Sequence, residues 1–273
     1  MAILNSQLEA HNRIKHFLEV FKQSEGAIRP HFHLTGSTGS GKTYLVKSLV
    51  EELELAMLEV NAANITAEGV AGNSLSKVLK PLRSSGSTPT VVFVDEFDKL
   101  FLQNGSSTEN WVSSVQDEFL KALEGGTFSV FGDYGNYDTI NIDNLLFIFA
   151  GSYGGNKMET EEDFRKAGLR AEFMGRVPLF FNVGNPEISE LINHISDTSL
   201  FQSYVELYQL DDEQKAKALS LVGQEIVETC KKHPIGVRLI NSCTHKVFMG
   251  IGIPIPEKQP KPKQTFDSWL ADK

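Results

Sequence analysis

Eight contiguous residues near the start of the chain have the composition of a phosphate-binding loop. Residues 36–43 read Gly-Ser-Thr-Gly-Ser-Gly-Lys-Thr, which matches the pattern G-x-x-x-x-G-K-[ST]. A strand-like run at 31–35 precedes them and a helical pattern at 44–53 follows. Glycines allow successive N–H groups to turn toward a polyphosphate, and the helix N-terminus adds partial positive charge. The segment therefore predicts binding of a nucleoside triphosphate such as ATP.

The side chains of this loop have separable roles. Lys42 is expected to reach the β- and γ-phosphates, and the hydroxyl of Thr43 is expected to hold Mg²⁺. The complete set of predicted phosphate-binding residues is Gly36, Ser37, Thr38, Gly39, Ser40, Gly41, Lys42 and Thr43.

A pair of acids supplies the second half of the predicted site. Residues 91–94 are four apolar residues, typical of a strand buried on both faces of a parallel sheet, and Asp95 and Glu96 follow them. Open α/β sheets bind ligands at this end of their strands. Asp95 is expected on the Mg²⁺ ion, and Glu96 is expected to polarise the attacking water. The pair taken alone could instead be a solvated loop, and Asp98 is expected to lie outside the group that contacts the ligand.

The elements that must position these residues alternate between strand and helix up to about residue 183. Apolar runs predict strands at 31–35, 55–60, 91–95, 145–149 and 177–182. A helical pattern at 112–123 is one of the segments between them, so we expect a three-layer α/β sandwich with a mostly parallel sheet.

Beyond residue 183 the pattern becomes all-helical. Helices are predicted at 188–201, 211–232 and 236–249, with Asp211 as a candidate N-terminal cap. The expected domains are an α/β nucleotide-binding domain at 1–183, a helical lid at 184–252, and a Pro/Lys linker with a terminal peptide at 253–273.

Composition indicates a globular chain rather than a membrane or secreted protein. The chain has 273 residues with 41% hydrophobic content, enough for one large and one small domain. Its first residues lack the pattern of a secretory signal, and no apolar run reaches the ~18 residues of a membrane span. Cys230 and Cys243 lack metal-ligand spacing and are expected to be small buried hydrophobic residues in a reducing, cytoplasmic compartment. The net charge of −9 argues against broad contact with nucleic acid, although a local basic patch stays compatible with it.

The order of these motifs resembles AAA+ ATPases, and within them the ATPase module of the ClpX and HslU type. The most specific likeness is at 168–178, Gly-Leu-Arg-Ala-Glu-Phe-Met-Gly-Arg-Val-Pro, which is similar to that family's arginine-finger box. The other segments that carry the likeness are 36–43, 59–66, 95–100, 120–125, 145–151 and 236–238.

The resemblance implies Mg²⁺-dependent ATP hydrolysis at the interfaces of a homo-oligomer, expected to be a hexameric ring. It makes Arg176 the arginine finger that reaches a neighbouring subunit's ATP, and Arg238 a nucleotide sensor in the lid. Ser152 is the candidate for the sensor after the strand at 145–149. Arg176 could instead cap a helix or pair with Glu172, and Arg238 could be a solvated lid residue.

Three departures from the family bear on the substrate. The phosphate loop begins at residue 36 and there is no cysteine cluster, so we expect the family's N-terminal zinc domain to be missing. Residues 152–163 run almost directly into the arginine-finger box, without the insertion that docks on the ClpP peptidase, which argues against ClpP as a partner. The pore-loop position reads Gly-Val-Ala-Gly at 69–72, with Val70 in place of an aromatic side chain that grips polypeptide.

Two classes of function remain open. The first is an ATP-driven ring that remodels, unfolds or disassembles a partner protein without ClpP. The second is a nucleic-acid-linked ATP switch, such as a helicase-loader or clamp-loader-like module. Phe266, Trp269 and Leu270 would share one face of a helical turn and could dock on a partner, or this peptide could pack on the lid or fray.

Overall fold

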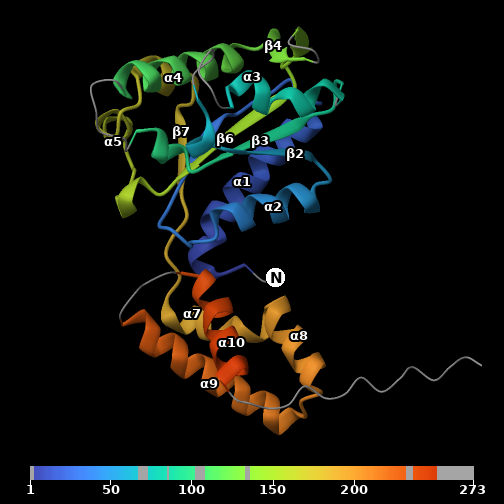
Figure 1. Cartoon of the computed structure of the whole chain (residues 1–273), viewed down its shortest axis with the longest axis vertical. Coiled ribbons are helices and arrows are strands. Elements are labelled where there is room, and N and C mark those ends of the chain that lie inside the picture. The colour runs from blue at the N-terminus through green and yellow to red at the C-terminus, as the bar shows by residue number, and fades with distance from the viewer. Residues whose placement is uncertain are drawn as a thin grey trace, which may run out of the picture.

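The computed structural model describes residues 3–66, 73–84, 86–101, 108–132, 136–231 and 236–250. Its described residues form two parts, an α/β part and, below it, a cluster of helices (Figure 1). No helix in these ranges combines the length and the apolar character that crossing a membrane requires. The loop at 69–72 and the terminal peptide with Phe266, Trp269 and Leu270 lie outside the described residues.

The α/β part is built on a five-stranded sheet in the order β2-β3-β6-β1-β7, in which every neighbouring pair is parallel. Each predicted strand is confirmed to within two residues at either end. Their bounds are β1 (Phe32–Thr35), β2 (Ala56–Asn61), β3 (Thr90–Asp95), β6 (Leu145–Gly151) and β7 (Leu179–Asn182). The expected α/β fold with a mostly parallel sheet is therefore confirmed.

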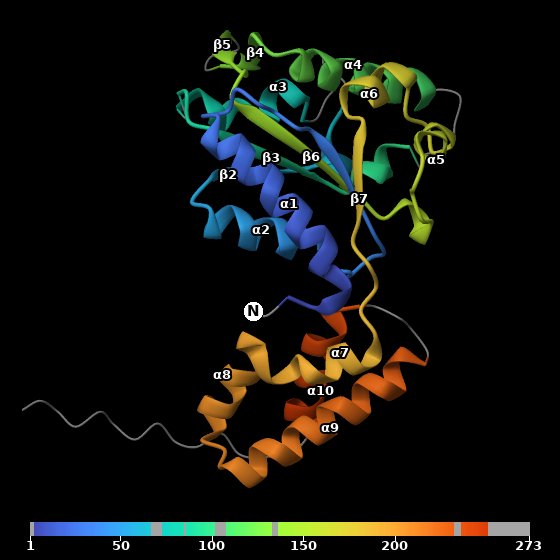
Figure 2. The same ribbon diagram turned by 180° about the vertical axis from the view of Figure 1, so that it is seen from behind.

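Helices cover both faces of this sheet, which explains why its central strands are continuously apolar. Val91 and Phe93 pack with α1 and α2, whereas Val92 and Val94 pack on the opposite face with α3, α4 and α6. Figures 1 and 2 show these two layers on either side of the strands. The helices of the α/β part are α1 (Asn5–Gln23), α2 (Lys42–Glu52), α3 (Leu75–Val78), α4 (Thr108–Glu124), α5 (Glu161–Lys166) and α6 (Ala171–Arg176). The short 3₁₀ turns are η1 (Ala62–Asn64), η2 (Lys80–Ser84), η3 (Phe97–Leu100) and η5 (Tyr153–Gly155).

The strict alternation of strand and helix is wrong between α4 and β6. An antiparallel hairpin, β4 (Thr127–Phe131) with β5 (Tyr137–Asn141), is inserted there as a separate sheet. Each of its strands buries only one side chain, Val130 in β4 and Ile140 in β5. Because neither strand contains a continuous buried run, the apolar pattern that located the main sheet did not reveal the hairpin.

The helical part after residue 183 has a core of its own, which includes Ile195, Phe201, Val222 and Ile240. Its helices are α7 (Ile188–Asn193), α8 (Ser199–Tyr208), α9 (Asp212–Cys230) and α10 (Arg238–Gly250), with the 3₁₀ turn η6 (Ile195–Asp197) between α7 and α8. We refer to this part as the lid. The division at 183/184 and the linker at 253–273 stay predictions.

The single helix predicted at 188–201 is wrong, since the chain breaks between α7 and α8. Thr198 adopts extended backbone angles, and its side chain accepts a hydrogen bond from the N–H of Phe201. A threonine in this position starts a new helix, which the apolar periodicity alone does not show. The predicted cap of the following helix is confirmed, because the Asp211 carboxylate accepts from the N–H of Gln214 at 2.8 Å.

His33, a residue of β1, has its ring among the aromatic side chains of the core. The ring of His33 is fully buried, 4.6 Å from that of Phe164 and 5.7 Å from that of Phe149. Neither ring nitrogen has a hydrogen-bond partner among the described residues. Burial lowers the pKa of His33 to about 3. This ring is therefore held in its neutral form.

Buried His33 is expected to make stability depend on acid pH. The unfolded chain binds a proton here near pH 6.5, whereas the folded chain does so only near pH 3. Between these values the unfolded state binds more protons, so the free energy of unfolding falls as the pH is lowered, by up to about 1.4 kcal/mol per pH unit. His33→Leu should flatten this dependence in urea unfolding between pH 6.5 and 4. The exposed His16, changed to Gln, is the control; equal slopes for the His33→Leu variant and the unmodified protein would contradict the prediction.

Candidate nucleotide-binding site

The loop at 36–43 joins β1 to α2, as the sequence predicts, and its shape depends on glycine. Gly36, Gly39 and Gly41 all have positive φ angles. A Cβ atom on Gly36 would come within 2.7 Å of the carbonyl oxygen of Val183, and one on Gly41 within 2.6 Å of Nε2 of Gln7. A side chain at position 36 would therefore collide with backbone, whereas at position 41 the positive φ of 93° disfavours one. The loop ends at the N-terminus of α2.

Lys42, the first residue of α2, lies folded against this loop. Its Nζ donates to the carbonyl oxygens of Gly36 at 2.7 Å and Ser37 at 2.9 Å. Burial lowers the pKa of Lys42, and the carboxylates of Asp95 and Asp98 oppose that shift. The ammonium group is thus held beside the loop and near two acids, in the position from which a lysine contacts a terminal phosphate.

The two residues predicted to hold Mg²⁺ come together. The Thr43 hydroxyl donates to Oδ2 of Asp95 at 2.8 Å, although the residues are far apart in the sequence. The second carboxylate oxygen of Asp95 accepts from the N–H of Glu96 at 2.8 Å. Hydroxyl and carboxylate oxygens are the ligands that Mg²⁺ prefers, so this donor set fits the ion.

Glu96 is exposed and lies one residue beyond the end of β3. Its backbone is left-handed, with φ 56° and ψ 32°, a conformation that costs a non-glycine residue free energy and is common at functional sites. Nδ2 of Asn61 donates to Oε2 of Glu96 at 3.4 Å. Asn61 was not predicted as a site residue. Its signal in the sequence is its place at the end of β2, where the parallel register puts it opposite Asp95.

Asp98 takes part in the site in a way the sequence analysis did not foresee. Phe97 is buried, and Asp98, which was expected outside the group that contacts the ligand, is buried too and lines the cavity. Its carboxylate accepts from the N–H of Ser152 at 3.1 Å, the hydroxyl of Ser152 at 3.2 Å and the N–H of Tyr153 at 3.1 Å. Asp98 therefore holds the segment that follows β6, and Ser152 reaches the cavity with its hydroxyl already bonded to this acid.

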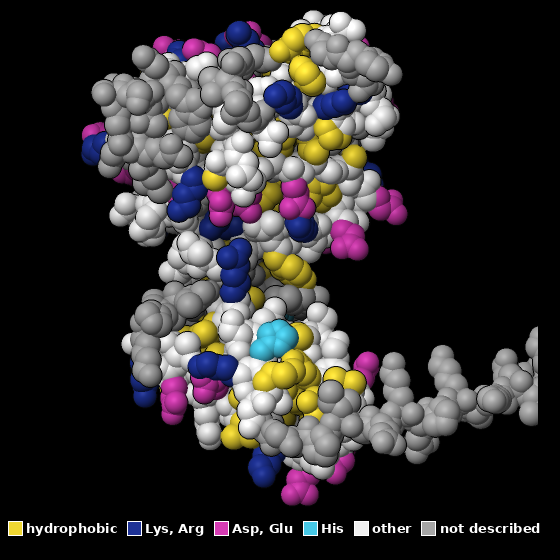
Figure 3. All heavy atoms as spheres, in the orientation of Figure 1, with side chains coloured by type: hydrophobic (Ala, Val, Ile, Leu, Met, Phe, Trp, Pro, Cys, Tyr) yellow, Lys and Arg dark blue, Asp and Glu magenta, His cyan; other side chains and the backbone are white. Residues whose placement is uncertain are grey.

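The lid closes the site from the other side. The N–H of Val237 donates to the carbonyl oxygen of Gly39 at 2.9 Å, so the lid is bonded directly to the loop. A cavity of about 440 Å³ lies between the loop and the lid. The loop residues that line it are Thr38, Gly39, Gly41, Lys42 and Thr43; Gly36 does not line it. Outside the loop it is lined by Asp95, Glu96, Asp98, Ser152, Val237 and Arg238, among others. Figure 3 shows acidic and basic side chains along the lower edge of the α/β part, where it meets the lid.

Gly236→Ala is expected to weaken nucleotide binding about 10-fold. Gly236 has φ +62°, and a Cβ atom there would lie 2.5 Å from the carbonyl oxygen of Gly39. Both the left-handed backbone and this backbone contact disfavour alanine, by about 1–2 kcal/mol together, so the lid must move away from the loop. Equilibrium binding of a fluorescent ATP analogue measures the effect. Gly223→Ala, a lid position with only ordinary contacts to Ile192, is the matched control; equal affinities for both variants would contradict this reading.

Arg176 is not among the described residues that line this cavity. It is the last residue of α6, is exposed, and pairs through Nη2 with Oε1 of Glu124 at 2.6 Å. Glu172, the alternative partner considered from the sequence, pairs with Arg170 instead. The arginine predicted to act on a neighbouring subunit is thus separated from the cavity of its own chain, which fits action in trans.

Comparison with known proteins agrees with this fold. Residues 32–160 match the family described as ATPase family associated with various cellular activities (AAA). The parallel sheet, the phosphate loop and the helical lid together define a AAA+ ATPase module.

Among curated proteins the chain is similar to ATP-dependent Clp protease ATP-binding subunit ClpX. It is 24% identical to the protein of Bacteroides thetaiotaomicron over 86% of this chain and 68% of that protein. It is 26% identical to ClpX 2 of Wolinella succinogenes over 83% of this chain and 66% of that protein, and 23% identical to the Borrelia duttonii protein over 89% and 68%. The chain therefore spans about two thirds of these relatives. Over most of its length it is similar to the AAA+ ATPase module of ClpX.

Proposed function

We propose that this chain hydrolyses ATP as a homo-oligomer, expected to be a hexameric ring, and uses the energy to remodel, unfold or disassemble a partner protein. The observation that carries the proposal is the arrangement at the strand ends. Thr43, Asp95 and Glu96 converge on one cavity under the lid, and Arg176 lies exposed outside it. This arrangement supports an ATPase whose site is completed by a second subunit.

Each residue on the cavity side has a chemical role in the proposal. The N–H groups of 36–43 and the Lys42 ammonium group bind the phosphates, and Thr43 with Asp95 holds the metal. Mg²⁺ bound there would neutralise charge on the phosphate oxygens. Glu96 accepts a proton from the attacking water, and Asn61 keeps that carboxylate in place through its 3.4 Å hydrogen bond.

The remaining roles concern the neighbouring subunit and the lid. Arg176 of one subunit stabilises negative charge on the γ-phosphate bound by the next. Arg238 contacts the nucleotide from the lid, and Ser152 senses the γ-phosphate while Asp98 holds its segment. The hydrogen bond from Val237 to Gly39 ties the lid to the phosphate loop, so a change at the phosphates alters the lid angle.

We further propose that the partner is a protein, that the work is done in the cytoplasm, and that ClpP is not required. The matched relatives carry a protease subunit's name, but in this chain β6 ends at Gly151 and α5 begins at Glu161, which leaves little chain for a peptidase-docking insertion. A nucleic-acid-linked ATP switch is the alternative, and the net charge of −9 counts against it.

Stimulation of the ATPase separates the two. A denatured globular protein should raise the steady-state rate several-fold if the chain remodels proteins, whereas single-stranded or duplex DNA should leave it unchanged. The Glu96→Gln variant, which we expect to trap ATP, then serves as bait for the partner. Stimulation by DNA alone would overturn the protein-remodelling proposal in favour of the nucleic-acid switch.

A further inference from the structure

A polar network docks the start of α6 onto α4. Gln116 of α4 is buried, and both ends of its amide are used: Nε2 donates to the carbonyl oxygen of Gly168 at 3.2 Å, and Oε1 accepts from the N–H of Arg170 at 3.0 Å. A buried amide with both groups bonded specifies one arrangement, because any shift of the partner backbone leaves a buried polar group unpaired. The backbone that enters α6 is therefore held in one position.

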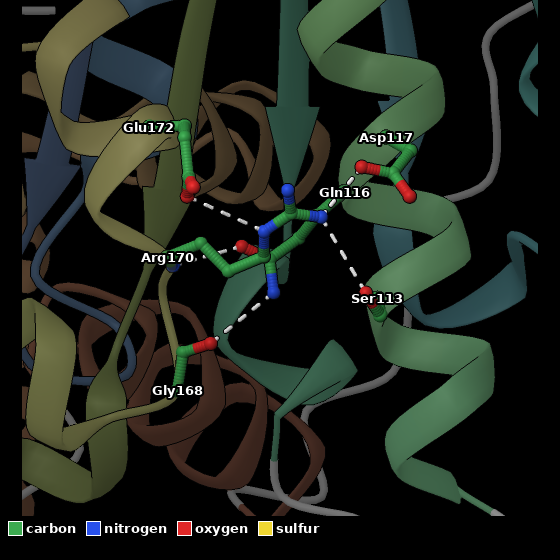
Figure 4. A network of polar contacts seen from close by, with 6 residues as sticks. All are labelled: Ser113, Gln116, Asp117, Gly168, Arg170 and Glu172. Carbon is green, nitrogen blue, oxygen red and sulfur yellow. Dashed lines mark hydrogen bonds and ion pairs between the residues drawn. The ribbon is translucent and has the colours of Figure 1, made fainter.

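The side chain of Arg170 makes a second connection between the two helices. Nη1 donates to Oδ1 of Asp117 at 2.5 Å and to the hydroxyl of Ser113 at 3.4 Å, and Nε lies 3.5 Å from Oε2 of Glu172. Figure 4 shows the guanidinium group between α4 and the start of α6, with acids on both sides. The guanidinium group of Arg170 thus fixes both the orientation of the N-terminal end of α6 and its distance from α4.

Arg176 lies at the other end of the same short helix. With a rise of about 1.5 Å per residue, it is roughly 9 Å from Arg170 along the axis. Between them, Phe173 and Met174 are buried in the core that also contains Phe119 and Leu120 of α4. The helix is too short to bend, so the position of Arg176 follows from how α6 is seated on α4.

We propose that Arg170 is a positioning residue for Arg176: with Gln116 and Asp117 it seats α6 on α4 and so sets where the Arg176 guanidinium meets the ATP of the neighbouring subunit. This inference rests on the proposed action of Arg176 in trans. The Arg170 side chain is one third exposed, and exposed ion pairs stabilise a fold by only about 0–1 kcal/mol. Displacement of a catalytic group by about 1 Å, in contrast, can lower a rate about 100-fold. Positioning and bulk stability therefore predict different results.

The test compares three variants of the full chain. Arg170→Met should lower kcat about 10-fold or more with little change in KM for ATP and in melting temperature. Asp117→Asn, which leaves Arg170 in place but removes its partner's charge, should lower kcat in the same direction. Lys166→Met, which breaks the exposed pair with Glu162 on the neighbouring α5, is the matched control and should be unchanged.

Mixed oligomers show on which subunit the defect lies. When Arg170→Met subunits are mixed with Glu96→Gln subunits, activity should partly recover, because an intact finger from the second then meets an intact base of the first. A merely destabilised subunit would show a lower melting temperature and no such recovery.

Each other outcome is informative. Normal turnover of Asp117→Asn beside a defective Arg170→Met would mean that Arg170 does not act through this network, and would overturn the inference. Failure of Arg170→Met to complement, while Arg176→Ala does complement, would also overturn it and leave the proposed function intact. Normal hydrolysis by Arg176→Ala would overturn both.

Discussion

Replacement of Glu96 by Gln is expected to preserve ATP binding and to lower turnover at least 100-fold. Gln keeps the shape of the side chain and can still contact Asn61, but an amide cannot accept the proton of the attacking water. General-base catalysis contributes about 10²–10⁴-fold, which sets the expected size of the loss. Steady-state phosphate release measures turnover, and equilibrium binding of a fluorescent ATP analogue measures affinity.

Two further variants are compared with Glu96→Gln, one that should lose binding and one that should be unchanged. Lys42→Ala should abolish binding itself, because the terminal phosphates lose their principal cation. Glu59→Gln carries the same substitution on an exposed residue of β2 that pairs with Lys47, and it should behave as the unmodified protein does. Hydrolysis by Glu96→Gln at close to the unmodified rate would rule out Glu96 as the base.

Arg176→Ala is expected to bind ATP and to lose about 10³-fold or more in turnover, the size found for arginine fingers. The loss is expected because the γ-phosphate of the neighbouring site then lacks its cation, while the cavity of the same chain is untouched. In the unmodified protein, specific activity should rise with protein concentration as subunits assemble. Nucleotide should favour the oligomer, since it contacts two subunits.

A control separates this effect from loss of the contact within the chain. Glu124→Gln removes the charge that pairs with Arg176 and leaves the arginine in place. Because this pair is exposed, its loss should change stability by at most about 1 kcal/mol, and hydrolysis should continue. Mixing Arg176→Ala with Glu96→Gln subunits should restore part of the activity. No recovery in verified mixed oligomers would argue against a site shared between subunits.

Much of the fold and of the site could be predicted from the sequence. The five strands of the main sheet are continuous apolar runs, because helices cover both of its faces, and the residues that follow β1 and β3 are then placed at one edge of the sheet. The hairpin β4–β5 and helix α1 were not assigned, and the break between α7 and α8 was missed. The hairpin strands bury one side chain each, and the break depends on the cap at Thr198, so apolar periodicity shows neither. Helix α1 does have buried residues at helical spacing, among them Ala10, Ile14, Leu18 and Phe21, so its pattern was present in the sequence and was not assigned.

The phosphate loop was determined by the sequence itself, since its conformation depends on glycines and a lysine that are contiguous in the chain. Only the tertiary structure decided which distant residues join it. Gln7 donates to the carbonyl oxygen of Ser40 in the loop, Asn61 donates to Glu96, and Asp98 accepts from the N–H of Tyr153 after β6. The tertiary structure also placed Arg176, the last residue of α6, beside Glu124 of α4 and outside the cavity of its own chain. The physical reason is the same throughout. Local backbone conformation depends on adjacent residues, whereas hydrogen bonds between elements depend on the register of the sheet and on how the helices pack against it.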